Sequence, residues 1–201
     1  RTGRIGLTHV LTPAGGTASE FTVSALAEDR FYLTSAAAAE EMDEDLLIAR
    51  SAGFAVTVRN VTDSLGVLGL MGPRSRDILS GLTDADLGAA FPWLSVREIT
   101  LAGVAVRALR VSYVGELGWE LHVARADLPT LFDALEAAGK PHGMGLFGAH
   151  SMNSMRLEKG YRAWKGDLST DYTVLQGGLE RFVDWTKPDF RGKAALAAEK
   201  A

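Results

Sequence analysis

The segment from residue 99 to residue 139 carries the strongest folding signal of the chain. Short apolar runs on either side of Ala102 and Gly103 predict a β-hairpin. Apolar residues then recur three and four positions apart from Leu128 to Leu135, which predicts an amphipathic helix. The elements expected here are strands over 99–101, 104–111 and about 118–124, and a helix over about 127–139. A hairpin, a strand and a helix in this order are typical of the α+β class.

The remaining sequence continues this mixed order. A second hairpin is expected over 20–26 and 30–35, and Ser35 is expected to cap the helix that Gly53 ends. The other expected elements are apolar runs over 54–61 and 65–70 and helical segments over 73–80, about 148–159 and 192–201. The predicted architecture is α+β, with two mixed ββα-type units containing antiparallel sheets. We place these units at residues 1–80 and 96–201.

Composition excludes several classes of protein. The 201 residues are 47% hydrophobic and 23% charged, as in a folded globular protein. The net charge of −4 is too small and of the wrong sign to attract nucleic acid, and no apolar stretch is long enough to span a membrane. The chain has no cysteine, so it contains no disulfide and no thiolate nucleophile. We expect a cytoplasmic protein, although the absence of cysteine fits either redox compartment.

Three further patterns are weak. Residues 143–148 match G-x-G-x-x-G, but a helix end rather than a buried strand precedes them, which favours an ordinary glycine-rich connection over a dinucleotide site. The four histidines lack the spacing of metal ligands, so no metal site is expected. The acidic run over 40–45 is typical of a solvated helix face.

Glu120 is the most informative charged residue. It lies within an apolar strand, and strand alternation places it on the side opposite Trp119 and Leu121, together with Gly118 and His122. That side is either the solvent-exposed face of a half-buried strand or a place where a ligand approaches. From spacing alone, Glu20 is an edge charge and Arg156 an exposed cation near a helix C-terminus.

Four runs together resemble the folate-binding domain shared by the glycine-cleavage T-protein and the C-terminal halves of dimethylglycine and sarcosine dehydrogenases. They are GVLGLMGPRSRDIL (66–79), VSYVGELGWELHV (111–123), SMRLEKGYRAW (154–164) and GLERFVD (178–184), the last followed by DFRGKAAL (189–196). The family's opening strands and its C-terminal β-barrel have no counterpart here. This absence, together with the first residue Arg1, favours a piece of a longer protein.

The resemblance implies a tetrahydrofolate site and one-carbon transfer. It places Glu120 on the pterin, Tyr113 in the same pocket, and Arg156 either on the folate or on a carboxylate of the pocket. The family's catalytic carboxylate falls on Glu20. The run S-E-F-T-V around Glu20 resembles the dehydrogenase branch, in which an upstream flavin domain with FAD oxidises the amine donor.

Departures from the family pattern leave alternatives open. Asn153 and Gln176 stand where the family has carboxylates, and amides keep the hydrogen bonding without the charge. The leading expectation is a folate-dependent transfer domain of a demethylating dehydrogenase that forms 5,10-methylenetetrahydrofolate. The alternatives are a glycine-cleavage aminomethyltransferase, a non-catalytic folate-binding module, and a scaffold whose pocket has decayed.

Overall fold

The computed structural model describes all of residues 1–201 and divides them into two compact units. Unit 1 contains residues 1–5, 24–32 and 60–161, and unit 2 contains residues 6–23, 33–59 and 162–201. Each unit is therefore assembled from three separate segments, whereas the ranges expected from the sequence, 1–80 and 96–201, are continuous.

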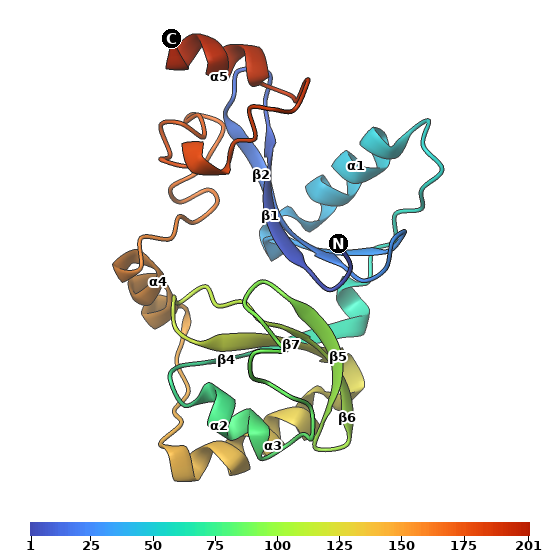
Figure 1. The fold of residues 1–201 in the computed structure, drawn as a ribbon, viewed down its shortest axis with the longest axis vertical. Coiled ribbons are helices and arrows are strands. Elements are labelled where there is room, and N and C mark those ends of the chain that lie inside the picture. The colour runs from blue at the N-terminus through green and yellow to red at the C-terminus, as the bar shows by residue number, and fades with distance from the viewer. The chain divides into compact units, whose positions relative to one another are not determined.

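Unit 1 is built on a four-stranded antiparallel sheet and three α-helices. The strands are β4 (Leu65–Met71), β5 (Val96–Leu101), β6 (Val104–Leu109) and β7 (Gly118–Ala124), and the helices are α2 (Ser75–Ser80), α3 (Leu128–Gly139) and α4 (Ala149–Glu158). The strand order is β4-β7-β6-β5. Helices α2 and α3 lie together on one face of this sheet (Figure 1).

Strand alternation creates the core of unit 1. Trp119, Leu121 and Val123 point from β7 into a cluster that includes Leu131 and Leu135 of α3. The Trp119 ring is fully buried and meets the Phe91 ring edge to face, with the ring centres 6.2 Å apart. The residues between them on β7 therefore project from the opposite face of the sheet.

The other sheet has the order β1-β2-β3, with bounds Ile5–Leu11, Thr17–Ala25 and Phe31–Thr34. Residues of these strands occur in both units. Unit 2 also contains helix α1 (Glu40–Ser51) and helix α5 (Lys193–Lys200). Its apolar cluster brings Leu11 of β1 together with Leu168, Val174, Leu179 and Leu196.

The predicted α+β class with antiparallel sheets is confirmed, as is the helix or strand type of most elements. Strand β7 coincides with the predicted 118–124. Residues 143–148 form a connection from a 3₁₀ turn to α4, in which Gly148 precedes the first helical residue. They do not follow a strand, so they lack the setting of a dinucleotide fingerprint.

At three places the local structure differs from what the sequence indicated, and one of them, the Ser35 cap, is an expectation that was wrong. The apolar run over 54–61 forms neither a helix nor a strand, and no neighbouring strand pairs with it. Ser35 does not cap α1, which begins at Glu40 after a 3₁₀ turn over 37–39. Strand β1 was not predicted at all, because its polar and apolar residues do not alternate clearly.

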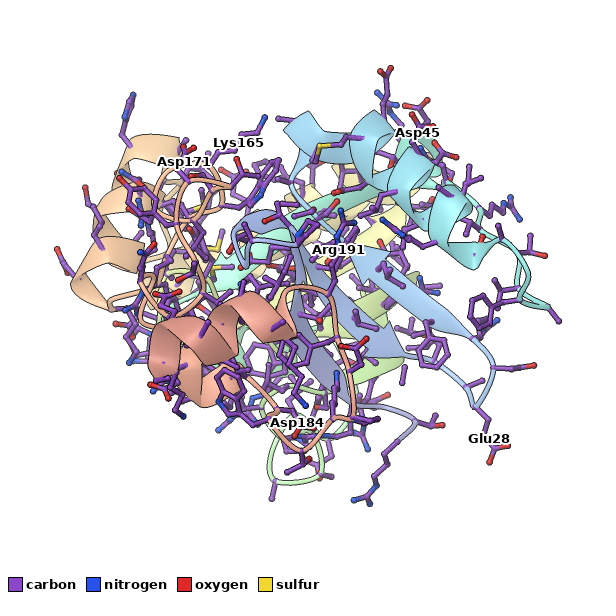
Figure 2. The ribbon with its side chains drawn as sticks, turned by 90° about the horizontal axis from the view of Figure 1, so that it is seen from above. Glu28, Asp45, Lys165, Asp171, Asp184 and Arg191 are labelled. Carbon is purple, nitrogen blue, oxygen red and sulfur yellow. The ribbon has the colours of Figure 1, made fainter.

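The acidic run on α1 is also not uniformly solvated. Asp45 is exposed on this helix (Figure 2). Asp43 is buried, and its carboxylate accepts a 2.6 Å hydrogen bond from the Ser19 hydroxyl on β2. This bond fixes α1 to the second strand. No helix of the chain combines the length and the apolar character that crossing a bilayer would require.

We predict that Leu131→Ala lowers the free energy of unfolding by about 2–5 kcal/mol, because the fully buried leucine leaves a cavity beneath β7. The matched control is Leu146→Ala, at a leucine that is 76% exposed and should change stability by less than about 0.5 kcal/mol. Urea unfolding of both variants measures the difference. Equal stability losses would contradict the assignment of Leu131 to the core.

Candidate functional site

Glu120 lies in the middle of β7, on the sheet face opposite the helices. In the strand register it stands beside Gly69 of β4 and Leu109 of β6. Its side chain is 29% exposed. The carboxylate is therefore partly buried and still within reach of a molecule that lies against this face.

Two glycines lie next to this carboxylate in the sheet. Gly69 stands directly opposite Glu120, and a Cβ there would lie 3.2 Å from Met71 Cε. At Gly118, a Cβ would lie 2.8 Å from the Met71 side chain and 3.0 Å from the Leu70 carbonyl oxygen. Glycine is thus required at 118 for close packing of β4 and β7, and the Met71 side chain packs over both glycines.

Tyr113 lies on the loop between β6 and β7. Its ring stacks on the Tyr161 ring, with the centres 6.4 Å apart and the planes 23° from parallel. Gly115 allows the loop to lie against the end of α4, because it adopts φ +79° and a Cβ there would clash with the Lys159 side chain. A surface cleft of about 340 Å³ opens beside this loop, lined by residues that include Trp93, Arg110, Gly118, Lys159 and Tyr161.

Arg156 is buried, so its interpretation as an exposed cation at the end of a helix was wrong. Its guanidinium donates to the Asn153 side-chain oxygen from Nε at 2.9 Å and from Nη2 at 2.7 Å. Nη1 donates to the Tyr161 carbonyl oxygen at 2.9 Å. Arg156 therefore fixes the backbone of the residue whose ring stacks on Tyr113.

Glu20 belongs to unit 2, in β2, which is the middle strand of its sheet. The interpretation as an edge charge was therefore wrong. The Glu20 carboxylate lies 2.8 Å from His9 Nε2 on β1, and both side chains are largely buried, with exposed fractions of 24% and 10%. A carboxylate is acceptor-only, so the imidazole donates this hydrogen bond.

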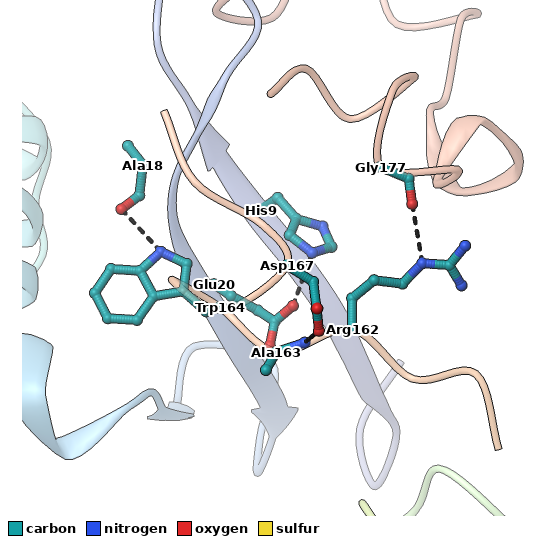
Figure 3. A network of polar contacts seen from close by, with 8 residues as sticks. All are labelled: His9, Ala18, Glu20, Arg162, Ala163, Trp164, Asp167 and Gly177. Atoms are coloured by element: carbon teal, nitrogen blue, oxygen red, sulfur yellow. Dashed lines mark hydrogen bonds and ion pairs between the residues drawn. The ribbon is translucent and has the colours of Figure 1, made fainter. Parts of the chain in front are cut away.

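The segment that follows residue 161 is anchored beside these strands by hydrogen bonds (Figure 3). The Trp164 indole N–H donates to the Ala18 carbonyl oxygen at 3.2 Å. The Asp167 carboxylate accepts from the Ala163 backbone N–H at 2.8 Å, and Arg162 Nε donates to the Gly177 carbonyl oxygen at 2.9 Å. The Trp164 bond attaches this irregular segment to β2 near Glu20, and the other two bonds lie within the segment itself.

Sequence reasoning did not predict roles for His9, Tyr32 and His122. His9 lies on the strand that was not predicted, so its neighbour could not be inferred. His122 was placed on the Glu120 side of β7, and the structure confirms this, since His122 Nε2 lies 3.5 Å from a Glu120 oxygen. Tyr32 approaches from β3, and its hydroxyl lies 2.9 Å from His122 Nδ1.

Three of the four predicted site residues, Tyr113, Glu120 and Arg156, lie in unit 1. Tyr113 and Arg156 are linked through Tyr161. Gly118 at the start of β7 lines the same cleft as Tyr161, whereas Glu120 and Tyr113 are not among the residues that line it. Glu20 is in unit 2 with His9. Unit 1 thus offers a carboxylate and a stacked aromatic pair, and unit 2 offers a carboxylate–imidazole pair.

The family to which the chain belongs follows from its match to a known family. The family described as GCVT N-terminal domain matches residues 1–187. The chain belongs to the GCVT N-terminal domain family. The resemblance to the T-protein and the dimethylglycine dehydrogenases, inferred from the four sequence runs, is therefore confirmed.

Two relatives illustrate the range of the family. Dimethylglycine dehydrogenase, mitochondrial, of Homo sapiens is 40% identical over 205 residues, which cover 100% of this chain and 24% of the relative. The aminomethyltransferase of Streptomyces avermitilis is 34% identical over 200 residues, which cover 99% of this chain and 54% of the relative. The chain thus spans about a quarter of the length of the dehydrogenase.

The fold agrees with a solved structure. The glycine cleavage system aminomethyltransferase T of Bartonella henselae superposes with a TM-score of 0.83, and the match covers 100% of this chain and 54% of that chain. At 22% identity this likeness establishes the fold alone. The predicted T-protein fold is confirmed.

Burial raises the pKa of the Tyr32 phenol above its usual 10.0, and the nearby Arg107 opposes this effect. The folded protein then keeps a proton that the unfolded chain has lost, so stability is lost as the pH rises from about 10 through the pKa of the folded state. We predict that Tyr32→Phe reduces this loss of stability at high pH. The difference in ultraviolet tyrosinate titration between the native chain and the variant measures the pKa, and a midpoint at or below that of free tyrosine would contradict the prediction.

Proposed function

We propose that the chain is a tetrahydrofolate-dependent one-carbon transfer domain in which Glu120 binds the pterin ring. The pterin presents its N3–H and 2-amino group side by side, and one carboxylate can accept from both donors. The observation behind the proposal is a partly buried carboxylate in the middle of β7, on the sheet face opposite the helices and beside Gly69. The Glu120 carboxylate therefore fits a ligand that carries a donor pair on its edge.

The aromatic residues beside the loop that precedes β7 support the same ligand. The stacked rings of Tyr113 and Tyr161 offer aromatic area beside the loop that leads into β7. Arg156 contributes by holding Tyr161 in place through its carbonyl oxygen. We infer that Tyr113 contacts the folate and that Arg156 stabilises this contact indirectly, through Tyr161.

Glu20 is our candidate for the proton-transfer residue. In the transfer, one methylene carbon passes from an iminium donor to two nitrogens of the folate, both N–H protons are displaced, and the amine is returned in its protonated form. A carboxylate held by His9 is suited to accept the proton displaced when the second carbon–nitrogen bond forms. The product of this reaction is 5,10-methylenetetrahydrofolate.

We assign the donor to the dehydrogenase branch of the family. The 40% identity to the human dimethylglycine dehydrogenase exceeds the 34% identity to the Streptomyces avermitilis aminomethyltransferase. In such a protein, an upstream flavin domain with FAD would oxidise a methylated amine and supply the iminium. The aminomethyltransferase reaction is the alternative, with an aminomethyl group as donor.

The two amides that replace family carboxylates argue against a decayed pocket. The Asn153 side-chain oxygen accepts two hydrogen bonds from Arg156. The Gln176 side-chain oxygen accepts a 3.0 Å hydrogen bond from the Thr173 backbone N–H. Both amides thus provide the acceptor oxygen that a carboxylate would provide, and the local structure around them is intact.

We predict that Glu120→Gln weakens tetrahydrofolate binding by about 1–3 kcal/mol, because one of the two ligand donors then meets an amide N–H rather than an acceptor. Anaerobic calorimetry measures the dissociation constant. Glu28→Gln, at an exposed glutamate in the β2–β3 turn (Figure 2), is the matched control and should leave the affinity unchanged. If Glu120→Gln binds as tightly as the control, Glu120 does not bind the pterin.

Glu20→Gln should lower the rate of methylene transfer without weakening tetrahydrofolate binding. We predict that the rate of methylene transfer falls by about 10²–10⁴-fold, because the amide cannot accept a proton. The dissociation constant for tetrahydrofolate should stay within about threefold of the native value, since less than about 1 kcal/mol of binding is at stake.

The assay for this prediction supplies an iminium formed from formaldehyde and a secondary amine, and the rate is corrected for the uncatalysed reaction. Glu28→Gln again serves as the control. Native turnover by Glu20→Gln would exclude Glu20 as the proton acceptor.

A further inference from the structure

His122 is a buried imidazole whose two nitrogens have different surroundings. Only 4% of the residue is exposed. Nδ1 lies 2.9 Å from the Tyr32 hydroxyl oxygen. Nε2 has no hydrogen-bond partner and faces the Glu120 carboxylate at 3.5 Å. A buried polar nitrogen without a partner is costly, so its position beside Glu120 requires an explanation.

The Glu120 carboxylate determines which nitrogen of His122 carries the hydrogen. A carboxylate offers no donor, so Nε2 must carry the hydrogen if the two groups are to attract each other. In the neutral imidazole, Nδ1 then presents a lone pair, and the Tyr32 hydroxyl must donate to it. The raised pKa of the Tyr32 phenol agrees with this, because the phenol keeps its proton.

Tyr32 itself is held from two sides. Its ring meets the His122 ring edge to face, with the centres 5.4 Å apart and the planes 89° apart. The Arg107 guanidinium lies over the ring, 4.5 Å from its centre, and pairs with Glu98 at 2.7 Å. Glu98, Arg107 and His122 are successive partners in the register of β5, β6 and β7, so the sheet fixes the whole row.

We propose that Tyr32 and His122 are positioning residues that orient the Glu120 carboxylate toward a ligand with two adjacent N–H donors. The Tyr32 hydroxyl donates to His122 Nδ1, and His122 Nε2–H donates to one oxygen of Glu120. A movement of about 0.5 Å by the carboxylate brings the 3.5 Å contact into hydrogen-bond range. Hydrogen bonds at such sites commonly tighten when the ligand binds.

This arrangement leaves the remaining lone pairs of the carboxylate to the ligand. A carboxylate accepts at both oxygens, so one bond from His122 does not block a bidentate contact. The inference rests on the proposed folate function, and it explains why a buried histidine occupies a strand position two residues from Glu120.

The test combines tetrahydrofolate binding with nitrogen NMR of the histidine side chains. His122→Asn should raise the dissociation constant about tenfold, the loss expected for a hydrogen bond to a charged group. His122→Gln can place an amide N–H near the Nε2 position and should restore the affinity to within about threefold. In the Glu120→Gln background, His122→Asn should have no further effect, because His122 acts through Glu120. His150→Asn, at an exposed histidine, is the matched control.

NMR of the ligand-free chain tests the relay independently of folate. With four histidines in the chain, the signal lost in His122→Asn identifies this residue. We expect the tautomer with hydrogen on Nε2, and Tyr32→Phe, which removes only the hydroxyl, should shift the Nδ1 signal. If the histidine variants fail to fold, Tyr32→Phe still tests the relay.

The outcomes separate the two proposals. A native chain that does not bind tetrahydrofolate overturns the proposed function, while the tautomer still decides the relay. Hydrogen on Nδ1, or a Tyr32→Phe variant with an unchanged Nδ1 signal, overturns the relay. The relay is also overturned if His122→Asn weakens tetrahydrofolate binding equally in the native chain and in the Glu120→Gln background.

Discussion

The pairing of β7 with β4 on one side and β6 on the other is the constraint on which the candidate site depends. It buries Trp119 and Leu121 against the helices and forces Glu120 and His122 to the other face. The same register sets Gly69 beside Glu120 and Arg107 beside His122. A shift of one residue would exchange the two faces, placing a carboxylate in the core and a tryptophan at the site.

Much of this could be predicted from the sequence, because strand alternation is a local property. The bounds of β7, the burial of Trp119 and the shared side of Glu120 and His122 all follow from the run 118–124. The neighbours that come from other strands could not be predicted, since register between distant segments leaves no local signal.

The residues that were misjudged illustrate this limit. Arg156 has the spacing of an exposed cation, yet it is buried, because Asn153 and the Tyr161 carbonyl oxygen satisfy its donors. Asp43 belongs to an acidic run typical of a solvated face, but Ser19 on a distant strand binds it. Glu20 lies on a central strand because β1, which the sequence pattern did not indicate, pairs beside it. In each case a partner far along the chain decides the environment.

We propose that the Glu120 carboxylate binds the donor edge of a reduced pterin, and a crystal structure of the chain with tetrahydrofolate would reveal this contact. We expect Glu120 oxygens at about 2.7–3.2 Å from the pterin N3 and the 2-amino nitrogen. His122 Nε2 should close on the same carboxylate. A pterin ring bound elsewhere, with Glu120 turned to solvent, would show that Glu120 does not bind the pterin.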